Sequence, residues 1–256
     1  MRKAVQSSDG VAIGTLTEGE GPPLLLVHGG MRTAANWKPL WPLLTASYRV
    51  TAMDRRGRGM SGDAPDYVGE REYDDVAAVA RHIGQVDVLA HSIGAVFALG
   101  AAARGAPIRR MLLCEPPGPP TQSREALERR SAWISEGQAG RALVELLVEV
   151  MGLDPAMLAA MRDTPQAADS LAVFIATYRR EGEFLQTVDL AALARDVTVP
   201  VHFLLGETSP AWAAEVTRAL APALPGADVT VVLGHGHDMV DSAPAAVAAT
   251  LAAFLA

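Results

Sequence analysis

The chain reads Val86-Asp87-Val88-Leu89-Ala90-His91-Ser92-Ile93-Gly94-Ala95 at the point that decides its fold. The first residues form a short apolar run that predicts a buried strand, and the alanine-rich run that begins at Ile93 predicts a helix. Ser92 therefore stands on the turn between them, with the small residues Ala90 and Gly94 two positions before and after it. This is the spacing of the G-x-S-x-G nucleophile elbow, in which small neighbours let the backbone turn sharply and expose the serine hydroxyl. Alanine in place of the first glycine weakens the motif, so the pentapeptide needs independent support.

Short apolar runs bounded by turn residues recur along the chain and predict buried strands. They are Leu24 to Val27, Tyr48 to Met53, Val86 to Leu89, Met111 to Cys114, Val201 to Leu205 and Val229 to Leu233. Segments with helical spacing lie between most of them, namely Tyr73 to Ile83, Ile93 to Arg104, Ala211 to Leu220 and Ala245 to Leu255. Strands that alternate with helices predict an α/β fold, with a mostly parallel sheet and helices on both of its faces.

The alternation breaks between Pro116 and Pro200. The run Pro116-Pro117-Gly118-Pro119-Pro120 neither continues a strand nor starts a helix at once, and apolar stripes with helical spacing follow it. We predict a core formed by residues 1–120 and 200–256, with a helical cap of residues 121–199 inserted into it. Helices that merely thicken the main core are the alternative, because apolar stripes do not show what they pack against.

The composition is that of a folded chain that buries a large core, since 50% of the 256 residues are hydrophobic and 20% are charged. The formal net charge of −7 weighs against nucleic acid as a partner. We expect Arg129-Arg130 and Arg179-Arg180 to lie on solvated helix faces. Cys114 is the only cysteine, so no internal disulfide can form and a reducing compartment is expected. No apolar run is long enough to span a bilayer, so we expect a cytoplasmic protein without a membrane partner, whose oligomeric state stays open.

A serine hydroxyl needs a base to accept its proton, and that base needs a third group to hold its orientation. Six histidines compete for the role of base. His237 is the preferred candidate, because it lies in a glycine-rich loop after the last predicted strand, and His235 in the same loop is the second. His202 falls within a strand and His82 on a helix, where packing or surface roles are expected. His91 should point away from the serine, as neighbours on a strand do.

Together these motifs resemble the α/β-hydrolase superfamily over almost the whole chain, in particular the small esterase, lactonase and cofactor-free haloperoxidase branch. The stretches that carry the resemblance are Leu24 to Gly30, Trp37, Met53 to Gly62, the turn at Ser92 and Gly234 to His237. The resemblance implies an oxyanion hole formed by the backbone N–H groups of Gly30 and Ile93, each contributing about 3 kcal/mol. For Asp54 a structural role in its loop is the preferred interpretation.

The acid is where the chain departs from the family pattern. Most members carry an aspartate after the strand that follows the cap, and Ser209 stands at that place here. Some members use an acid from the strand before the cap, and Glu115 follows the predicted strand Met111 to Cys114 directly. We prefer Glu115 as the acid, because a strand-end residue followed by two prolines is well fixed. Glu207 is the alternative acid, and surface roles for both glutamates or a dyad without a strong acid stay open.

A serine instead of an aspartate at the elbow disfavours the haloalkane dehalogenase and epoxide hydrolase branches. The resemblance then implies a small-molecule substrate: Ser92 attacks the carbonyl of a small or medium apolar ester, lactone or thioester, His237 transfers the proton, and water hydrolyses the acyl-enzyme. Neither a metal nor an organic cofactor is expected. One alternative is a different use of the same site, for perhydrolysis, C–C cleavage or a biosynthetic elimination or cyclisation. The other is a ligand-binding protein built on a hydrolase fold.

Overall fold

The computed structural model describes residues 1–156, 158 and 164–256. Within them the chain forms an eight-stranded sheet in the order β1-β2-β4-β3-β5-β6-β7-β8. The strands are β1 Arg2–Gln6, β2 Ala12–Glu18, β3 Pro23–Val27, β4 Arg49–Met53, β5 Val86–His91, β6 Ile108–Cys114, β7 Val201–Gly206 and β8 Asp228–Val232. All pairs from β4 to β8 are parallel, whereas β2 pairs antiparallel with both β1 and β4. The predicted, mostly parallel sheet is confirmed.

Strands β1 and β2 form an antiparallel edge that the search for apolar runs does not detect. Four of the five β1 side chains are exposed. Strand β2 contains Thr15 and Thr17 among its apolar residues, so it has no continuous apolar run. Edge strands of this kind carry a weaker sequence signal than the fully buried parallel strands in the middle of the sheet.

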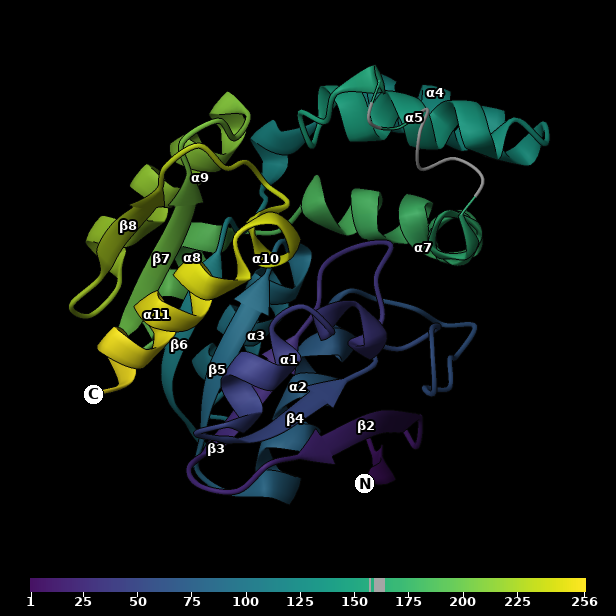
Figure 1. Cartoon of the computed structure of the whole chain (residues 1–256). Helices are drawn as coiled ribbons and strands as arrows, with labels where there is room; N and C mark the ends of the chain where they lie inside the picture. Colours follow the sequence, from purple (N-terminus) through teal and green to yellow (C-terminus); the bar gives the residue numbers. More distant parts are fainter. Residues whose placement is uncertain (157, 159–163) are drawn as a thin grey trace.

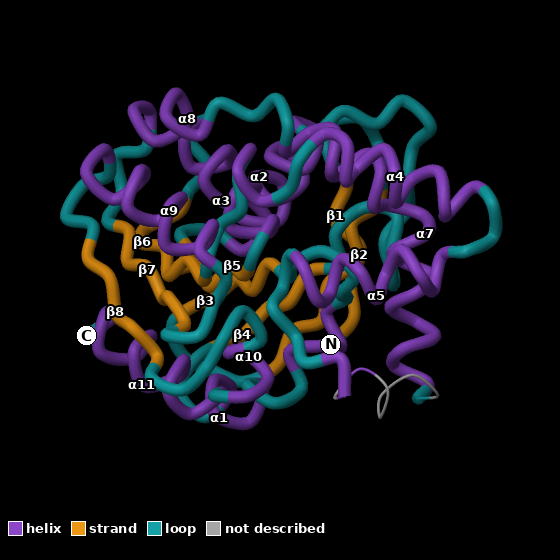
Figure 2. Tube along the Cα trace, turned by 90° about the horizontal axis from the view of Figure 1, so that it is seen from above, coloured by secondary structure: helices purple, strands orange, loops and turns teal. Residues whose placement is uncertain are grey.

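Helices cover both faces of the sheet (Figures 1 and 2). One face packs against α2 Glu70–Ile83, α3 Ile93–Ala103, α8 Leu190–Asp196 and α9 Ala211–Leu220, which share one apolar cluster with the strands. The other face packs against η1 Ala34–Trp37, α1 Trp41–Thr45, α10 Met239–Ser242 and α11 Pro244–Leu255. A short turn of helix, η3 Ala221–Ala223, follows α9. The predicted α/β fold is therefore confirmed.

A helical insert connects β6 to β7 and lies beyond the carboxyl ends of the strands (Figure 1). It contains η2 Pro119–Thr121, α4 Arg124–Ser135, α5 Ala139–Glu149 and α7 Pro165–Leu185. Helices α4, α5 and α7 pack on one another around Leu127, Leu146 and Phe174, and this small core continues to Trp212 on α9. Helix α8, which ends the insert, packs instead against α3 of the core. The division of the chain at 121–199 stays a prediction.

The arginine pairs of the insert differ from the expectation of solvated faces. Arg129 and Arg179 are exposed, but Arg130 is only 1% exposed and donates to Glu145 at 2.8 Å. Arg180 of α7 donates to Asp63 of the core at 2.8 Å. The expectation is wrong for Arg130, because the acidic side chains of α5 cover it, and Arg180 joins the insert to the core.

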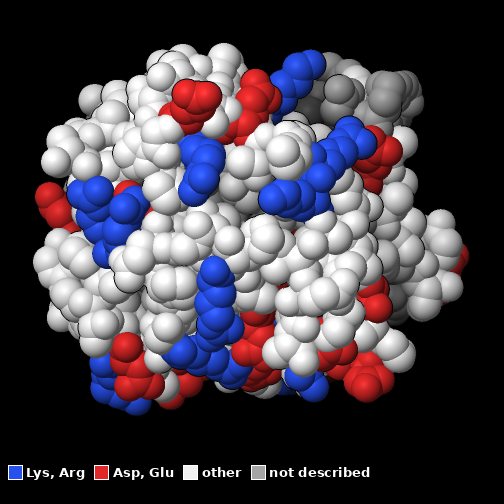
Figure 3. Space-filling view, turned by 90° about the horizontal axis from the view of Figure 1, so that it is seen from below, with Lys and Arg blue, Asp and Glu red and all other residues white. Residues whose placement is uncertain are grey.

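Charges of both signs are mixed on the face of the molecule shown in Figure 3, where basic side chains lie in separate groups beside acidic ones. Among the described residues, no helix combines the length and the apolar character needed to cross a membrane. In the same part of the chain, no group of three or more His, Cys, Asp or Glu side chains is arranged to hold a metal ion.

Candidate active site

Three neighbouring strand ends carry residues with an unusual backbone. Strands β3, β5 and β6 lie side by side in the sheet, and Met31, Ser92 and Glu115 follow them. Their φ angles are 57°, 54° and 48°, and they are the only non-glycine residues with positive φ in the described ranges. This conformation costs roughly 1–3 kcal/mol for each residue, and such strain gathers at functional sites. The backbone conformation therefore indicates a functional site at this edge of the sheet, independently of any sequence motif.

The predicted turn at Ser92 is present. Strand β5 ends at His91 and helix α3 begins at Ile93, while the Ser92 N–H donates to the carbonyl oxygen of Cys114 at 2.8 Å. A Cβ atom on Gly94 would lie 2.4 Å from the backbone oxygen of His28, so only glycine allows α3 to approach β3 this closely. Close packing of the helix behind the serine thus fixes the turn.

His237 and Glu115 form a buried hydrogen-bonded pair. The distance between His237 Nδ1 and Glu115 Oε2 is 2.6 Å. Because a carboxylate accepts hydrogen bonds, Nδ1 carries the proton and Nε2 is left as an acceptor. Nε2 is buried and has no hydrogen-bond partner among the described residues. In this tautomer the imidazole has the free lone pair that a general base requires.

The other carboxylate oxygen of Glu115 binds the loop that follows β7. Oε1 accepts a hydrogen bond from the Gly206 N–H at 2.7 Å and another from the Ser209 hydroxyl at 2.5 Å. Ser209, which stands where most of the family carries its aspartate, is therefore a donor to the glutamate. Glu207 is exposed and accepts from the Gly234 N–H at 2.8 Å, which joins the β7 loop to the His237 loop. The structure brings Glu115 and His237 together and does not bring Glu207 to the imidazole.

Two aromatic side chains surround His237. The ring of His91 lies 4.8 Å from that of His237, and its Nε2 donates to the His237 carbonyl oxygen at 2.9 Å. Burial lowers the pKa of His91 well below its ordinary value, and the neighbouring His237 adds to this effect. Trp212 meets His237 edge to face at 5.1 Å and donates to the Val150 carbonyl at 2.7 Å. The hydrogen bond from His91 thus joins the His237 loop to β5, and Trp212 of α9 connects the same loop to Val150 of the insert.

The turn after β3 lies against the serine. A Cβ atom on Gly29 would be 3.0 Å from Ser92 Cβ and 2.9 Å from His91 Nδ1. Within the described ranges, neither the Gly30 N–H nor the Ile93 N–H has a hydrogen-bond acceptor. Two free N–H groups on adjoining turns are the arrangement that an oxyanion needs.

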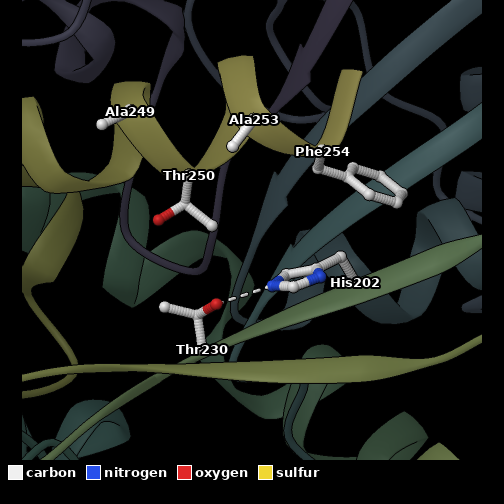
Figure 4. A pocket seen from close by; sticks show the side chains of 6 residues that line it. All are labelled: His202, Thr230, Ala249, Thr250, Ala253 and Phe254. Carbon is white, nitrogen blue, oxygen red and sulfur yellow. Dashed lines mark hydrogen bonds between the residues drawn. The ribbon is translucent and has the colours of Figure 1, made fainter. Parts of the chain in front are cut away.

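Three further histidines make no hydrogen bond to the Glu115–His237 pair. His82 is exposed on α2, and His235 bonds the Ser242 hydroxyl at 3.0 Å. His202 bonds Thr230 at 2.9 Å in a hollow of about 510 Å³ between β7, β8 and α11 (Figure 4).

A second hollow, of about 210 Å³, reaches His237 itself. It is lined by Met151, Gly152, Leu153 and Asp154 of the insert and by Thr208, Gly234, His235, Gly236, Asp238 and Ser242.

The loop after β4 holds buried ion pairs to which the sequence assigned no role. Arg55 donates to Glu72 through Nε and Nη2 at 2.6 Å and 2.7 Å. Glu181 of α7 accepts from Arg55, and from Arg58 at 2.8 Å, on its Oε1 atom. Burial alone would raise the pKa of Glu181, but the two guanidinium groups hold it below its ordinary value. Asp54 accepts from two backbone N–H groups of its surroundings, in line with the structural role preferred for it.

Comparisons with known proteins identify the family of this chain. A family model described as "Alpha/beta hydrolase family" matches residues 24–250. The crystal structure of an alpha/beta hydrolase from Sphaerobacter thermophilus is 33% identical, with a TM-score of 0.87 over 99% of this chain and 100% of that one. The 2-(acetamidomethylene)succinate hydrolase of Mesorhizobium japonicum is 27% identical over 91% of this chain and 90% of its own length. The enol-lactonase of Burkholderia xenovorans shares the fold, with a TM-score of 0.80 at 23% identity over 99% of each chain. From the match over residues 24–250, this chain belongs to the alpha/beta hydrolase family.

Proposed function

We propose that this chain is a serine hydrolase that cleaves a carboxylic ester, lactone or thioester through an acyl-enzyme on Ser92. The substrate is a small or medium apolar molecule. Ser92 is the nucleophile, His237 the base and Glu115 the acid that orients it, in preference to Glu207. The backbone N–H groups of Gly30 and Ile93 form the oxyanion hole.

The hydrogen bond of 2.6 Å between His237 Nδ1 and Glu115 Oε2 carries this proposal. It leaves Nε2 unprotonated and buried, so that the imidazole can accept the serine proton. Negative charge on Glu115 then stabilises the imidazolium that forms. The same bond supports catalysis over a purely ligand-binding role, since it supplies the carboxylate that is missing at Ser209.

We infer the reaction from these proposed roles. Ser92 Oγ attacks the acyl carbonyl as His237 takes its proton, and the carbonyl oxygen becomes an oxyanion facing the Gly30 and Ile93 N–H groups. His237 then returns the proton to the leaving alcohol or thiol. Water then attacks the acyl-enzyme with His237 as base. The carboxylic acid is released, and the free serine hydroxyl is restored.

The name of one relative indicates a second kind of bond as a candidate for cleavage. The Mesorhizobium japonicum protein, similar over 91% of this chain, is named for hydrolysis of 2-(acetamidomethylene)succinate rather than of an ester. Amide-bearing substrates therefore belong in the substrate panel beside esters and lactones. Perhydrolysis, C–C cleavage and elimination or cyclisation at the same site stay as alternatives to be tested where the ester panel shows no turnover.

Fluorophosphonate labelling followed by peptide mass spectrometry tests the nucleophile without knowledge of the substrate. We expect modification at Ser92 and turnover of p-nitrophenyl esters, with Ser92→Ala reducing kcat by about 10³-fold or more. Ser135→Ala, at an exposed position on α4, is the matched control and should keep full activity. Labelling at another residue, or full turnover by pure Ser92→Ala, would rule out this nucleophile. A folded protein that resists the probe yet binds ligands tightly would favour the binding role.

A further inference from the structure

A carboxylate that the proposed reaction does not use lies close to Gly30. A Cβ atom on Gly30 would lie 3.4 Å from Oε2 of Glu181, which comes from α7 of the insert. Apart from Gly30's own chain neighbours, no other atom of the described residues lies within 4 Å of that position. The Glu181 carboxylate is therefore the neighbour of Gly30, the residue proposed for the oxyanion turn.

The two oxygens of Glu181 have different surroundings. Oε1 accepts hydrogen bonds from Arg55 and Arg58, whose side chains are 0% exposed. The Glu181 side chain keeps 8% exposure, and neither of these hydrogen bonds reaches Oε2. The arginines thus bind one oxygen, while the oxygen nearest to Gly30 is left as an acceptor.

Charge decides which substrate group this oxygen suits. The arginines keep the pKa of Glu181 below its ordinary value, so the carboxylate is ionised at neutral pH and can only accept hydrogen bonds. Arg55 and Arg58 are balanced by Glu72 and Glu181, two charges of each sign, so the cluster has no surplus positive charge. A carboxylate within hydrogen-bond distance of Oε2 would meet a like charge in a poorly solvated place, where like charges repel strongly.

We propose that Glu181 determines specificity by accepting a hydrogen bond from a hydroxyl or amide N–H on the acyl part of the substrate, close to the scissile carbonyl. A carboxylate at the same place on the substrate is rejected. A site built to pair a polar group discriminates against analogues that lack it, because its own buried acceptor is then left unpaired. This inference rests on the proposed function, since it takes Gly30 as the oxyanion turn.

Three p-nitrophenyl esters with different acyl groups test the inference: 3-hydroxybutyrate, butyrate and hydrogen succinate. We expect kcat/KM of the wild-type protein to be about tenfold or more higher for 3-hydroxybutyrate than for butyrate, and lowest for hydrogen succinate. Glu181→Leu should bring the ratio of the first two values close to one and raise relative turnover of hydrogen succinate. Each ratio is taken within one protein preparation, so a loss of folded enzyme cancels.

Glu183→Leu is the matched control, because Glu183 lies on the same helix, is exposed and pairs only with Arg179 among the described residues. It should leave all three ratios unchanged. A wild-type ratio near one, an unchanged ratio in Glu181→Leu, or a preference for hydrogen succinate would overturn the inference.

The proposed function fails separately, through the absence of fluorophosphonate labelling at Ser92. In that case calorimetric binding of the ethyl esters of the same three acids to Ser92→Ala replaces kinetics. Tighter binding of the hydroxy ester than of the butyrate, lost in the Ser92→Ala, Glu181→Leu double variant, would still support the inference. Any other order would overturn it.

Discussion

The Glu115 carboxylate makes three hydrogen bonds, and their partners come from two different parts of the chain. His237 lies in the loop after β8, while Gly206 and Ser209 lie at the end of β7 and just beyond it. Two donors on Oε1 hold the carboxylate in place while Oε2 faces the imidazole. A carboxylate held this way keeps the imidazole in one tautomer.

Replacing each glutamate by glutamine separates the two candidate acids. Glu115→Gln offers an amide that no longer carries the charge that stabilises the imidazolium, so we expect kcat to fall by about 10³-fold or more. Glu207→Gln keeps an oxygen that can accept from Gly234 and should change kcat by less than about threefold. Ester kinetics on both variants check this. A large loss in Glu207→Gln alone would move the role of acid to that residue.

At this scale the sequence indicates some of the proposed site residues and not others. The order of the motifs along the chain indicates Ser92 and His237, because each residue follows an apolar strand and has a glycine close to it. It prefers Glu115 as the acid but leaves Glu207 open, because that choice depends on where β6 and β7 lie in the sheet. Glu181 was missed because it comes from the insert, more than a hundred residues from the arginines it meets in sequence. No local pattern marks such a contact.

Among the elements, the buried parallel strands are the best predicted. Strand β7 was expected over Val201 to Leu205 and spans Val201–Gly206, and α9 was predicted with its observed bounds. These elements are bounded by proline or by turn residues and carry continuous apolar runs or clear helical stripes. Strand β1 was missed, because an exposed edge strand needs no apolar face.

Helix α3 depends on its glycine at position 94. A Cβ there would lie 2.4 Å and 2.6 Å from the backbone oxygens of His28 and Val27, and backbone atoms cannot move aside as a flexible side chain can. We therefore expect Gly94→Ala to lower the free energy of unfolding by about 3 kcal/mol, the upper end for overpacking. Urea denaturation measures the change.

Gly140 in α5 provides the matched control. A Cβ there would have nothing within 4 Å, and the position is helical. Gly140→Ala should raise the free energy of unfolding by about 0.4–1 kcal/mol, because alanine loses less backbone entropy on folding. Equal stability of the Gly94→Ala variant and the wild-type protein would mean that α3 can shift away from β3 at little cost.

For the whole molecule, two buried histidines link stability to pH. His28 Nε2 accepts from the Arg55 backbone N–H at 3.1 Å, which requires this nitrogen to be unprotonated. His91 Nε2 donates to the His237 carbonyl at 2.9 Å, and its buried Nδ1 has no partner among the described residues that would stabilise a second proton. Burial lowers the pKa of each well below the ordinary 6.5, and nearby positive charge, chiefly Arg55, lowers that of His28 further. The unfolded chain therefore binds protons that the folded chain does not. Their contribution to stability is complete above pH 6.5 and is lost as the pH falls below it.

We expect the free energy of unfolding to fall between pH 6.5 and pH 5, with a slope of up to about 1.4 kcal/mol per pH unit for each histidine. Urea denaturation at half-unit steps of pH measures this slope. His91→Gln keeps an amide donor for the His237 carbonyl and removes one titrating group, so its slope should be smaller by up to about 1.4 kcal/mol per pH unit. His82→Gln, at an exposed position of α2, is the control. A flat wild-type profile over this range would show that His28 and His91 bind protons equally in the folded and unfolded chains.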